Sequence, residues 1–473
     1  MMPYFDLMES YDSDFMPKGD KLHRGTNGPL KIVNAGSGKM PVSPVAKEFI
    51  ASSLAAGLQL ASSGFNAVED DKRLGVGYYE FTIRNGVRDS VAAALLGNVE
   101  NGWSIPKSLV VKTDSTVQNI EFDLSPSKPR AVGVNYVTSK SKGVLRARLK
   151  EHDRHTKRPH EVILAAGAIM TPQILSNSGI SDGGIIMDLK AVGKNLQDHP
   201  VVAIAFEDSE GLKKAVSDYL HDAQVVEDNS VKTKDIMGHS KNFYHNGKGL
   251  EGVLGTPGFS VGAFLASPWA DEAVPDIQLT VFPRIIEPHY MYQIMNNGKP
   301  DNMKMLITVA LLRPEGKHRI KLAPFNQTTK SDDFEKFLYQ SLPTILPEQG
   351  DIYLSDSDAK KLEWGITQVR TIKNSGPLAN STGNECFPGS HIKGNDLQDF
   401  IKRTVMTNSH WCGSTRMGTD PNNSVVDEFL RVHGVDRLRI VDTGIMPYIP
   451  NGNTHSTACA AALRAADLIL DDL

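Results

Sequence analysis

The stretch Glu161-Val-Ile-Leu-Ala-Ala-Gly-Ala-Ile-Met-Thr-Pro-Gln-Ile-Leu-Ser-Asn-Ser-Gly179 decides the fold class. Its first part, Glu161–Ala166, is a nearly continuous apolar run, which is typical of a parallel strand covered on both faces. Gly167 ends this strand, and Thr171-Pro172 favours the start of a short helix that Gly179 closes. The order strand, glycine, helix predicts an α/β domain.

A second strand and a long helix are predicted near the C-terminus. Leu438–Asp442 forms the strand, and a helix runs from about Thr454 to Ile469. Its segment Thr454–Ala466 has one charged residue, Arg464, and otherwise mostly small side chains, so we expect it to be packed on most of its surface. The free N–H groups at its N-terminus would stabilise an anion, although a helix that only fills a core is an equally good interpretation of this pattern.

The middle of the chain predicts a different architecture. Between about residues 205 and 395, short apolar strands such as Ile277–Phe282 and Lys304–Leu311 alternate with polar loops. This pattern predicts an antiparallel sheet with helices on one side. Nearer the N-terminus, a helix is expected from Ser43-Pro44 to about Leu60, with Ser43 as its N-cap. Ser108–Val117 is expected to form a strand and its turn.

Composition excludes several classes of protein. The 473 residues are 40% hydrophobic and 22% charged, as in ordinary globular proteins. The net charge of −4 gives no basic surface for a nucleic acid, and no apolar run approaches the roughly 20 residues of a membrane span. The three cysteines, Cys386, Cys412 and Cys459, lack metal-site spacing. The first residues lack the features of a signal peptide, which leaves a secreted or a cytoplasmic location open.

His410 is the first candidate for catalysis. A single histidine is usually structural, but this one precedes Trp411 and a run of small residues ending at Gly418. The run His410-Trp-Cys-Gly-Ser-Thr-Arg-Met-Gly418, followed by Leu438-Arg-Ile-Val-Asp-Thr-Gly-Ile-Met-Pro447 and Gly452-Asn-Thr454, resembles the C-terminal block of the glucose–methanol–choline oxidoreductases. Within that family it is most similar to the flavin domain of cellobiose dehydrogenase.

Other landmarks of this family occur in order along the chain. Gly167–Ile180 resembles its second sequence signature, with Ser181 where the family has glycine, and Val192-Gly-Lys-Asn-Leu-Gln-Asp-His199 follows. Arg24–Pro29 and Asn85–Ser90 also resemble family segments. The resemblance therefore extends over nearly the whole chain.

The resemblance implies a Rossmann-like FAD-binding domain interleaved with an α+β antiparallel-sheet substrate domain. We expect residues 1–83 to be part of the substrate or cap domain, 84–204 the first part of the FAD-binding domain, and 205–395 the substrate-binding domain. Residues 396–473 would complete the FAD-binding domain and carry the active site.

The resemblance also implies a mechanism and its residues. An alcohol or sugar CH–OH group would lose hydride to the flavin, with His410 as base and Asn453 as the hydrogen-bonding partner. FAD would contact Asn453, Thr454 and His455 at the last helix. The remaining expected contacts are Val117 at the adenine, Gly167, and Asp442 with Thr443 at the pyrophosphate. No metal is expected.

One family feature is missing from the sequence. No GxGxxG follows a first strand, since Gly36-Ser-Gly38 continues into Lys-Met-Pro and Gly75-Val-Gly77 into Tyr-Tyr-Glu. The sequence therefore predicts an N-terminally truncated chain without the first βαβ unit.

Two alternatives stay open: a non-redox member similar to hydroxynitrile lyases, and an inactive remnant without cofactor. The substrate and the electron acceptor are not fixed by the sequence, although Trp411 favours a sugar or bulky alcohol.

Overall fold

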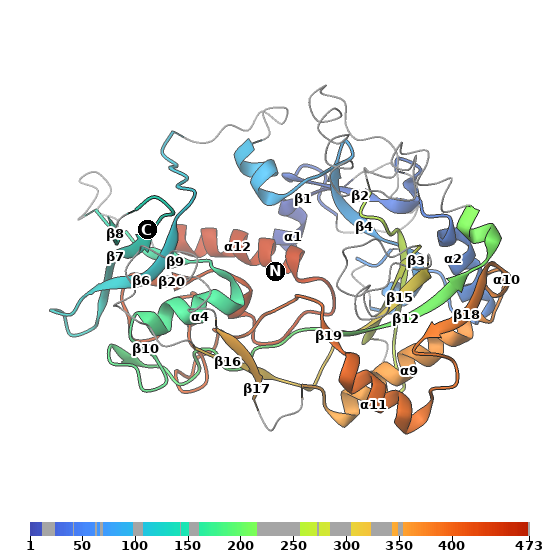
Figure 1. Cartoon of the computed structure of the whole chain (residues 1–473). Coiled ribbons are helices and arrows are strands. Elements are labelled where there is room, and N and C mark those ends of the chain that lie inside the picture. The colour runs from blue at the N-terminus through green and yellow to red at the C-terminus, as the bar shows by residue number, and fades with distance from the viewer. Residues whose placement is uncertain are drawn as a thin grey trace.

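The structure is a computed structural model, and two parts lie side by side in it (Figure 1). It describes residues 1–11, 24–40, 42–61, 64–66, 70–97, 107–141, 143–150, 160–214, 256–271, 274–283, 304–322, 343–348 and 353–471. The part on the right of Figure 1 is an antiparallel sheet with helices, and the part on the left is an α/β arrangement. The chain passes repeatedly between the two parts, which confirms the predicted fold class, an α/β domain interleaved with an α+β antiparallel-sheet domain.

The larger sheet has the strand order β18-β12-β15-β14-β13-β3, and β19 pairs with the start of β12. Each neighbouring pair is antiparallel. The predicted strands Ile277–Phe282 and Lys304–Leu311 are confirmed as β14 and β15. The others are β3 (Gly75–Tyr78), β12 (Pro200–Asp208), β13 (Val261–Leu265), β18 (Thr382–Phe387) and β19 (Met406–Thr407).

Helices cover one face of this sheet. They are α2 (Val45–Ala55), α9 (Asp356–Lys373), α10 (Leu378–Ser381) and α11 (Gly394–Thr404). Alternate residues of β12 and β15, among them Val202, Ile204 and Ile307, point to this face and are fully buried beneath the helices. The opposite face carries smaller side chains, including Ala203 and Ala310.

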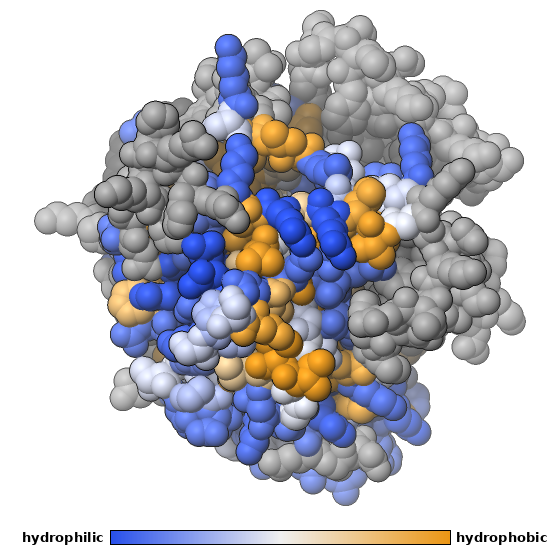
Figure 2. All heavy atoms as spheres, turned by 90° about the vertical axis from the view of Figure 1, so that its left-hand side faces the viewer, coloured by the Kyte–Doolittle hydropathy of each residue, from blue (hydrophilic) through white to orange (hydrophobic). Residues whose placement is uncertain are grey.

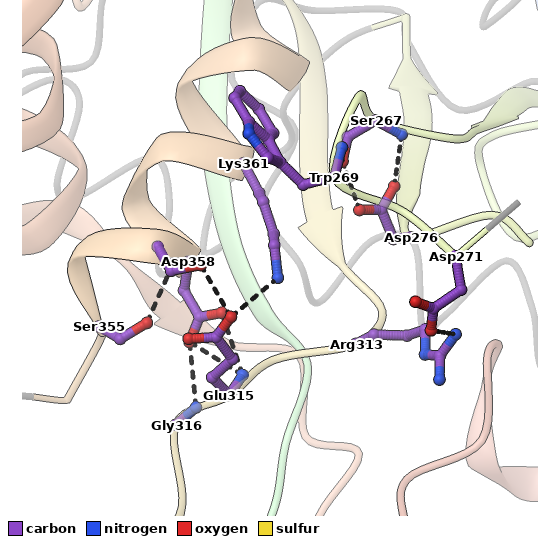
Figure 3. A network of polar contacts seen from close by, with 11 residues as sticks. Ser267, Trp269, Asp271, Asp276, Arg313, Glu315, Gly316, Ser355, Asp358 and Lys361 are labelled. Carbon is purple, nitrogen blue, oxygen red and sulfur yellow. Dashed lines mark hydrogen bonds and ion pairs between the residues drawn. The ribbon is translucent and has the colours of Figure 1, made fainter.

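A polar network fixes the end of β15 against α9 (Figure 3). Ser355 caps α9 through the Asp358 amide, and the Asp358 carboxylate accepts hydrogen bonds from the backbone N–H groups of Glu315 and Gly316. Burial raises the pKa of Asp358, and these donors oppose the rise. Nearby, the Asp276 carboxylate accepts from Ser267, at 2.6 Å from its hydroxyl. The network holds the chain just beyond β15 in one position.

The left-hand part, which we call the cofactor half, is built on two parallel strands. β9 (Val162–Leu164) pairs with β20 (Leu438–Ile440), and α4 (Gly167–Asn177) follows β9. The helix begins a turn earlier than predicted and contains Pro172. The predicted role of Gly179 just past the helix is confirmed by its φ of 79°.

Two predictions about burial in the cofactor half are wrong for the described residues. Val162 and Leu164 are buried, but Ile163 between them is 46% exposed. Among the described strands, β9 has a hydrogen-bonded neighbour, β20, on one side only. The last helix, α12 (Thr454–Asp471), buries Ala460, Ala465 and Leu468 but leaves residues such as Ala462 and Ala466 exposed.

Smaller sheets complete the fold. A three-stranded antiparallel sheet, β6-β7-β8, lies at the far end of the cofactor half (Figure 1). Figure 2 faces that end and shows a band of hydrophobic residues between hydrophilic ones, as protein surfaces commonly have. The remaining strands are β6 (Thr116–Asp123), β7 (Arg130–Val137), β8 (Leu145–Arg148), β10 (Ile180–Ser181), β11 (Met187–Asp188), β16 (His318–Lys321) and β17 (Thr344–Pro347).

The N-terminal elements pack between the two parts. Helix α1 (Met2–Met8) contacts α12, and a four-stranded sheet has the order β1-β2-β4-β5. These strands are β1 (Glu9–Tyr11), β2 (Leu30–Asn34), β4 (Glu80–Arg84) and β5 (Val87–Arg88), and a short helix, α3 (Asp70–Arg73), precedes β3.

Two local predictions need correction. Helix α2 ends at Ala55 rather than near Leu60, and the Ser43 side chain does not cap it. The strand expected from Ser108 begins only at Thr116, because residues 109–113 have no strand partner and the backbone bends at Asp114, where φ is 51°.

Candidate active site

His410 is positioned by the strand pair β19–β12. Thr407 pairs with Pro200, which brings the residue before β12, His199, next to the loop after β19. The backbone N–H of Asn408 donates to the His199 carbonyl, and that of His410 donates to the Asp198 carboxylate at 2.8 Å. Two segments about two hundred residues apart in sequence therefore place two imidazoles side by side.

The two imidazoles form a direct hydrogen bond. His199 Nδ1 lies 2.9 Å from His410 Nδ1, and the rings meet edge to face at 88°. His199 Nε2 lies 3.0 Å from the carbonyl oxygen of Pro450, which can only accept, so that nitrogen carries the proton. A neutral His199 then accepts at Nδ1, and His410 donates from its own Nδ1. The structure places Asn408 Nδ2 3.3 Å from His410 Nδ1, so this tautomer requires the nitrogen and oxygen of the Asn408 amide to be exchanged. It leaves His410 Nε2 unprotonated.

Burial keeps both rings neutral. It lowers the pKa of His410 to about 4, and burial together with the His410 charge lowers the pKa of His199 to about 3. Burial raises the pKa of Asp198 to about 6, against hydrogen bonds from Thr407 and the His410 backbone. At neutral pH the His410 ring can therefore accept a proton.

Asn453 lies in the loop before α12, three residues after the Pro450 carbonyl that holds His199. A second contact ties this loop to the larger sheet, since Asn451 Nδ2 donates to the Pro275 carbonyl at 3.4 Å. The Asn453 side chain is exposed, and its Oδ1 lies 3.5 Å from Gln278 Nε2 on β14. The predicted pair, His410 and Asn453, thus belongs to one cluster at the seam between the two parts.

Asp442 joins the strand end, α4 and the following turn. Its carboxylate accepts from Gly167 N at 3.0 Å, from Thr171 Oγ1 at 2.6 Å and from Gly444 N at 2.8 Å, and burial raises its pKa. Thr443 begins the short turn Thr443–Ile445 that Asp442 caps. The structure therefore brings Gly167, Asp442 and Thr443 together, with the carboxylate occupied by protein donors.

Thr454 and His455 form the first turn of α12. Thr454 is buried, while partial burial and the nearby Arg88 lower the pKa of His455. Arg88 and the helix N-terminus together supply positive charge at this point. Val117, on β6, packs against the apolar core of the cofactor half.

The end of β9, Gly167 and the N-terminus of α12 fit the flavin end of FAD. The carboxyl end of β9 presents Ile163, Ala165 and Ala166 to solvent, and a Cβ placed on Gly167 would meet no atom within 4 Å. A flat apolar ring needs such an open apolar surface, and its anionic reduced form needs the positive α12 N-terminus.

The sequence did not assign roles to three residues of this cluster. Asp198 and His199 end a segment that resembles a family landmark, and Gln278 alternates with Thr280 on one face of β14. The available signal was an amide between the apolar residues Ile277 and Leu279. In the part of the chain that the structure describes, no group of three acidic, cysteine or histidine side chains could hold a metal ion. No described helix has the length and apolarity needed to cross a membrane.

Two family models match the chain, at residues 1–201 and 343–462, and both describe GMC oxidoreductases. The protein belongs to the GMC oxidoreductase family. Its relatives include the oxygen-dependent choline dehydrogenases of Brucella anthropi and Acinetobacter baumannii, both 28% identical over 99% of this chain and 74% of theirs. As a family member it is a FAD-dependent oxidoreductase acting on CH–OH donors.

Solved GMC structures share the fold. A pyridoxine 4-oxidase from Mesorbium loti superposes with a TM-score of 0.69 at 22% identity, over 98% of this chain and 76% of that one. A formate oxidase superposes with a TM-score of 0.74 at 19% identity, over 99% of this chain and 77% of that one. The closer resemblance to cellobiose dehydrogenase stays a prediction, and the N-terminal family model matches from residue 1 although the GxGxxG motif is not in the sequence.

Proposed function

We propose that this GMC oxidoreductase oxidises an alcohol or sugar hydroxyl to a carbonyl, with His410 as the base and Asn453 as the hydrogen-bonding partner of the reacting oxygen. The proposal depends on one observation: the His199–His410 hydrogen bond and the Pro450 carbonyl together leave His410 Nε2 free to accept a proton. A neutral imidazole held in one tautomer is the arrangement that a general base requires.

The substrate loses one proton and one hydride. The hydroxyl proton passes to His410 Nε2, the C–H electron pair leaves as hydride, and the carbon–oxygen single bond becomes a double bond. Bound FAD supplies the two-electron acceptor. Asn453 offers an amide donor to the oxygen while it carries negative charge. Thr454, His455 and the positive α12 N-terminus would hold the flavin, Asp442 and Thr443 would contact the pyrophosphate region of FAD, and Gly167 would be a further FAD contact.

The surroundings of Trp411 bear on the expected preference for a sugar or bulky alcohol. Trp411 packs against Ala168, Leu196 and Ile320, within the cofactor half. We therefore look for further determinants of a preference for sugars on the larger sheet, on the other side of the seam.

Anaerobic reduction of the flavin tests the proposal. Protein loaded with FAD is mixed with alcohols and sugars under nitrogen, and absorbance near about 450 nm is followed, because two-electron reduction bleaches this band. Bleaching by an alcohol or sugar is the expected result. A yellow protein that no such compound bleaches would support the hydroxynitrile lyase-like alternative. Absence of bound flavin and of any FAD-induced rise in Tm would support the inactive remnant.

A further inference from the structure

The helix-free face of the larger sheet lies beside the catalytic cluster. Residues opposite one another on neighbouring strands share a face, and one such row contains Val201, Ala310, Gln278 and Phe264. The next row contains Ala203, Thr308, Thr280 and Gly262. Neither row has a charged side chain, and Gln278 is the one amide in them.

Hydrogen bonds fix the orientation of the Gln278 amide. Tyr79 donates its single hydroxyl hydrogen to the Leu279 carbonyl at 2.7 Å, so its oxygen can only accept from other groups. The Gln278 amide, 3.1 Å away, must therefore present its nitrogen to Tyr79. The same nitrogen lies 3.5 Å from Asn453 Oδ1. The Gln278 nitrogen therefore donates toward the Asn453 oxygen, and the NH₂ group of Asn453 points away from Gln278.

Among the described residues, the side-chain oxygen of Gln278 has no hydrogen-bond partner. The residue is 6% exposed, and its Oε1 is buried without a hydrogen bond. A buried acceptor that is left unpaired is destabilising, so a donor on a bound molecule would remove this cost. The unpaired oxygen belongs to the amide that reaches Asn453, so such a donor would be close to the reacting group.

We propose that Gln278 determines substrate specificity: its nitrogen orients Asn453, and its oxygen accepts a hydrogen bond from a second hydroxyl next to the reacting carbon. The substrate class is thus a neutral vicinal diol or sugar. The absence of charge from both rows fits a neutral molecule. This inference rests on the proposed function and narrows it.

The test compares substrates that differ by one hydroxyl. The pairs are hexane-1,2-diol with hexan-1-ol and glucose with 2-deoxyglucose, and kcat/KM is measured for wild type, Q278L and Q278M. Wild type is expected to prefer the member with the extra hydroxyl by about fivefold or more, the value of one buried hydrogen bond. Both variants should lose this preference. Q173L, which alters a buried amide on α4 away from the seam, should keep it.

Binding is measured without turnover. Enzyme reduced by dithionite cannot oxidise an alcohol, so the rise in its Tm with each compound reports binding alone. Wild type should be stabilised more by the diol than by the monoalcohol, and Q278L equally by both. The role of Gln278 would be overturned if its variants lost kcat/KM equally for both members of each pair, or if they kept the wild-type preference. Failure of every alcohol to bleach the wild-type flavin would instead overturn the proposed function. The Tm measurement would still show whether Gln278 binds the second hydroxyl.

Discussion

Two isoleucines show how the two parts of the molecule differ. Ile307 in the larger sheet is fully buried beneath helices of this chain, whereas Ile163 in the parallel strand pair is 46% exposed. Both lie in apolar strands. The larger sheet thus encloses its hydrophobic side chains with its own helices, while the described cofactor half leaves an apolar strand end and the small-sided α12 open. We interpret this open surface as the place of the flavin.

The largest expected effect is on catalysis at the seam between the two parts. His410→Ala removes the base, so turnover should fall by roughly 10²–10⁴-fold in flavin-loaded protein. Stopped-flow measurement of flavin reduction gives the rate. His391→Ala, at a histidine outside the cluster, is the matched control and should leave the rate unchanged. A loss below about tenfold for His410→Ala would show that another group takes the proton.

The next effect concerns stability and tests the comparison of the two isoleucines directly. Ile307→Ala removes a fully buried side chain and should cost about 2–5 kcal/mol, whereas Ile163→Ala, at a half-open position, should cost well under half of that without FAD. Thermal unfolding of both variants, with and without FAD, measures this.

The same experiment also tests the place of the flavin. The rise in Tm caused by FAD should be smaller for Ile163→Ala than for wild type, and unchanged in size for Ile307→Ala. Equal stability losses for the two variants would mean that Ile163 is covered after all and that the two parts do not differ in this respect.

The smallest effect is the dependence on pH. The pKa of His410 is lowered to about 4, so the free enzyme keeps a neutral base down to that pH, and kcat/KM should fall only as pH drops through about 4. An unshifted imidazole would instead lose activity near about 6.5. An acid limb near that value would indicate that water reaches the ring and that the seam is not closed.

The free energy of unfolding should also decrease as the pH falls. Between about pH 4 and 6.5 the unfolded chain binds protons at His199 and His410 that the folded protein does not, so stability falls as pH falls. Asp198 opposes this loss, because its pKa is raised to about 6 and the folded protein therefore binds one proton there that the unfolded chain does not. The Tm should therefore decrease from pH 7 to pH 5, and His199→Phe should reduce the decrease.

Prediction from the sequence succeeded where local patterns carry the information. The strands β14 and β15, the glycine after α4 and the start of α12 at Thr454 follow from periodicity and turn chemistry. It failed at Ile163, because an apolar run shows that a strand avoids water but not which molecule covers it. The assignment of residues 1–83, 84–204, 205–395 and 396–473 to domains stays a prediction.

The sequence by itself determined the family, the fold class and the two residues proposed for catalysis, since these depend on motifs that are continuous in the chain. Only the tertiary structure decided that His199 holds His410 and that Gln278 faces Asn453. These contacts join residues more than 170 positions apart, and a hydrogen bond depends on distances of about 3 Å that sequence order does not encode.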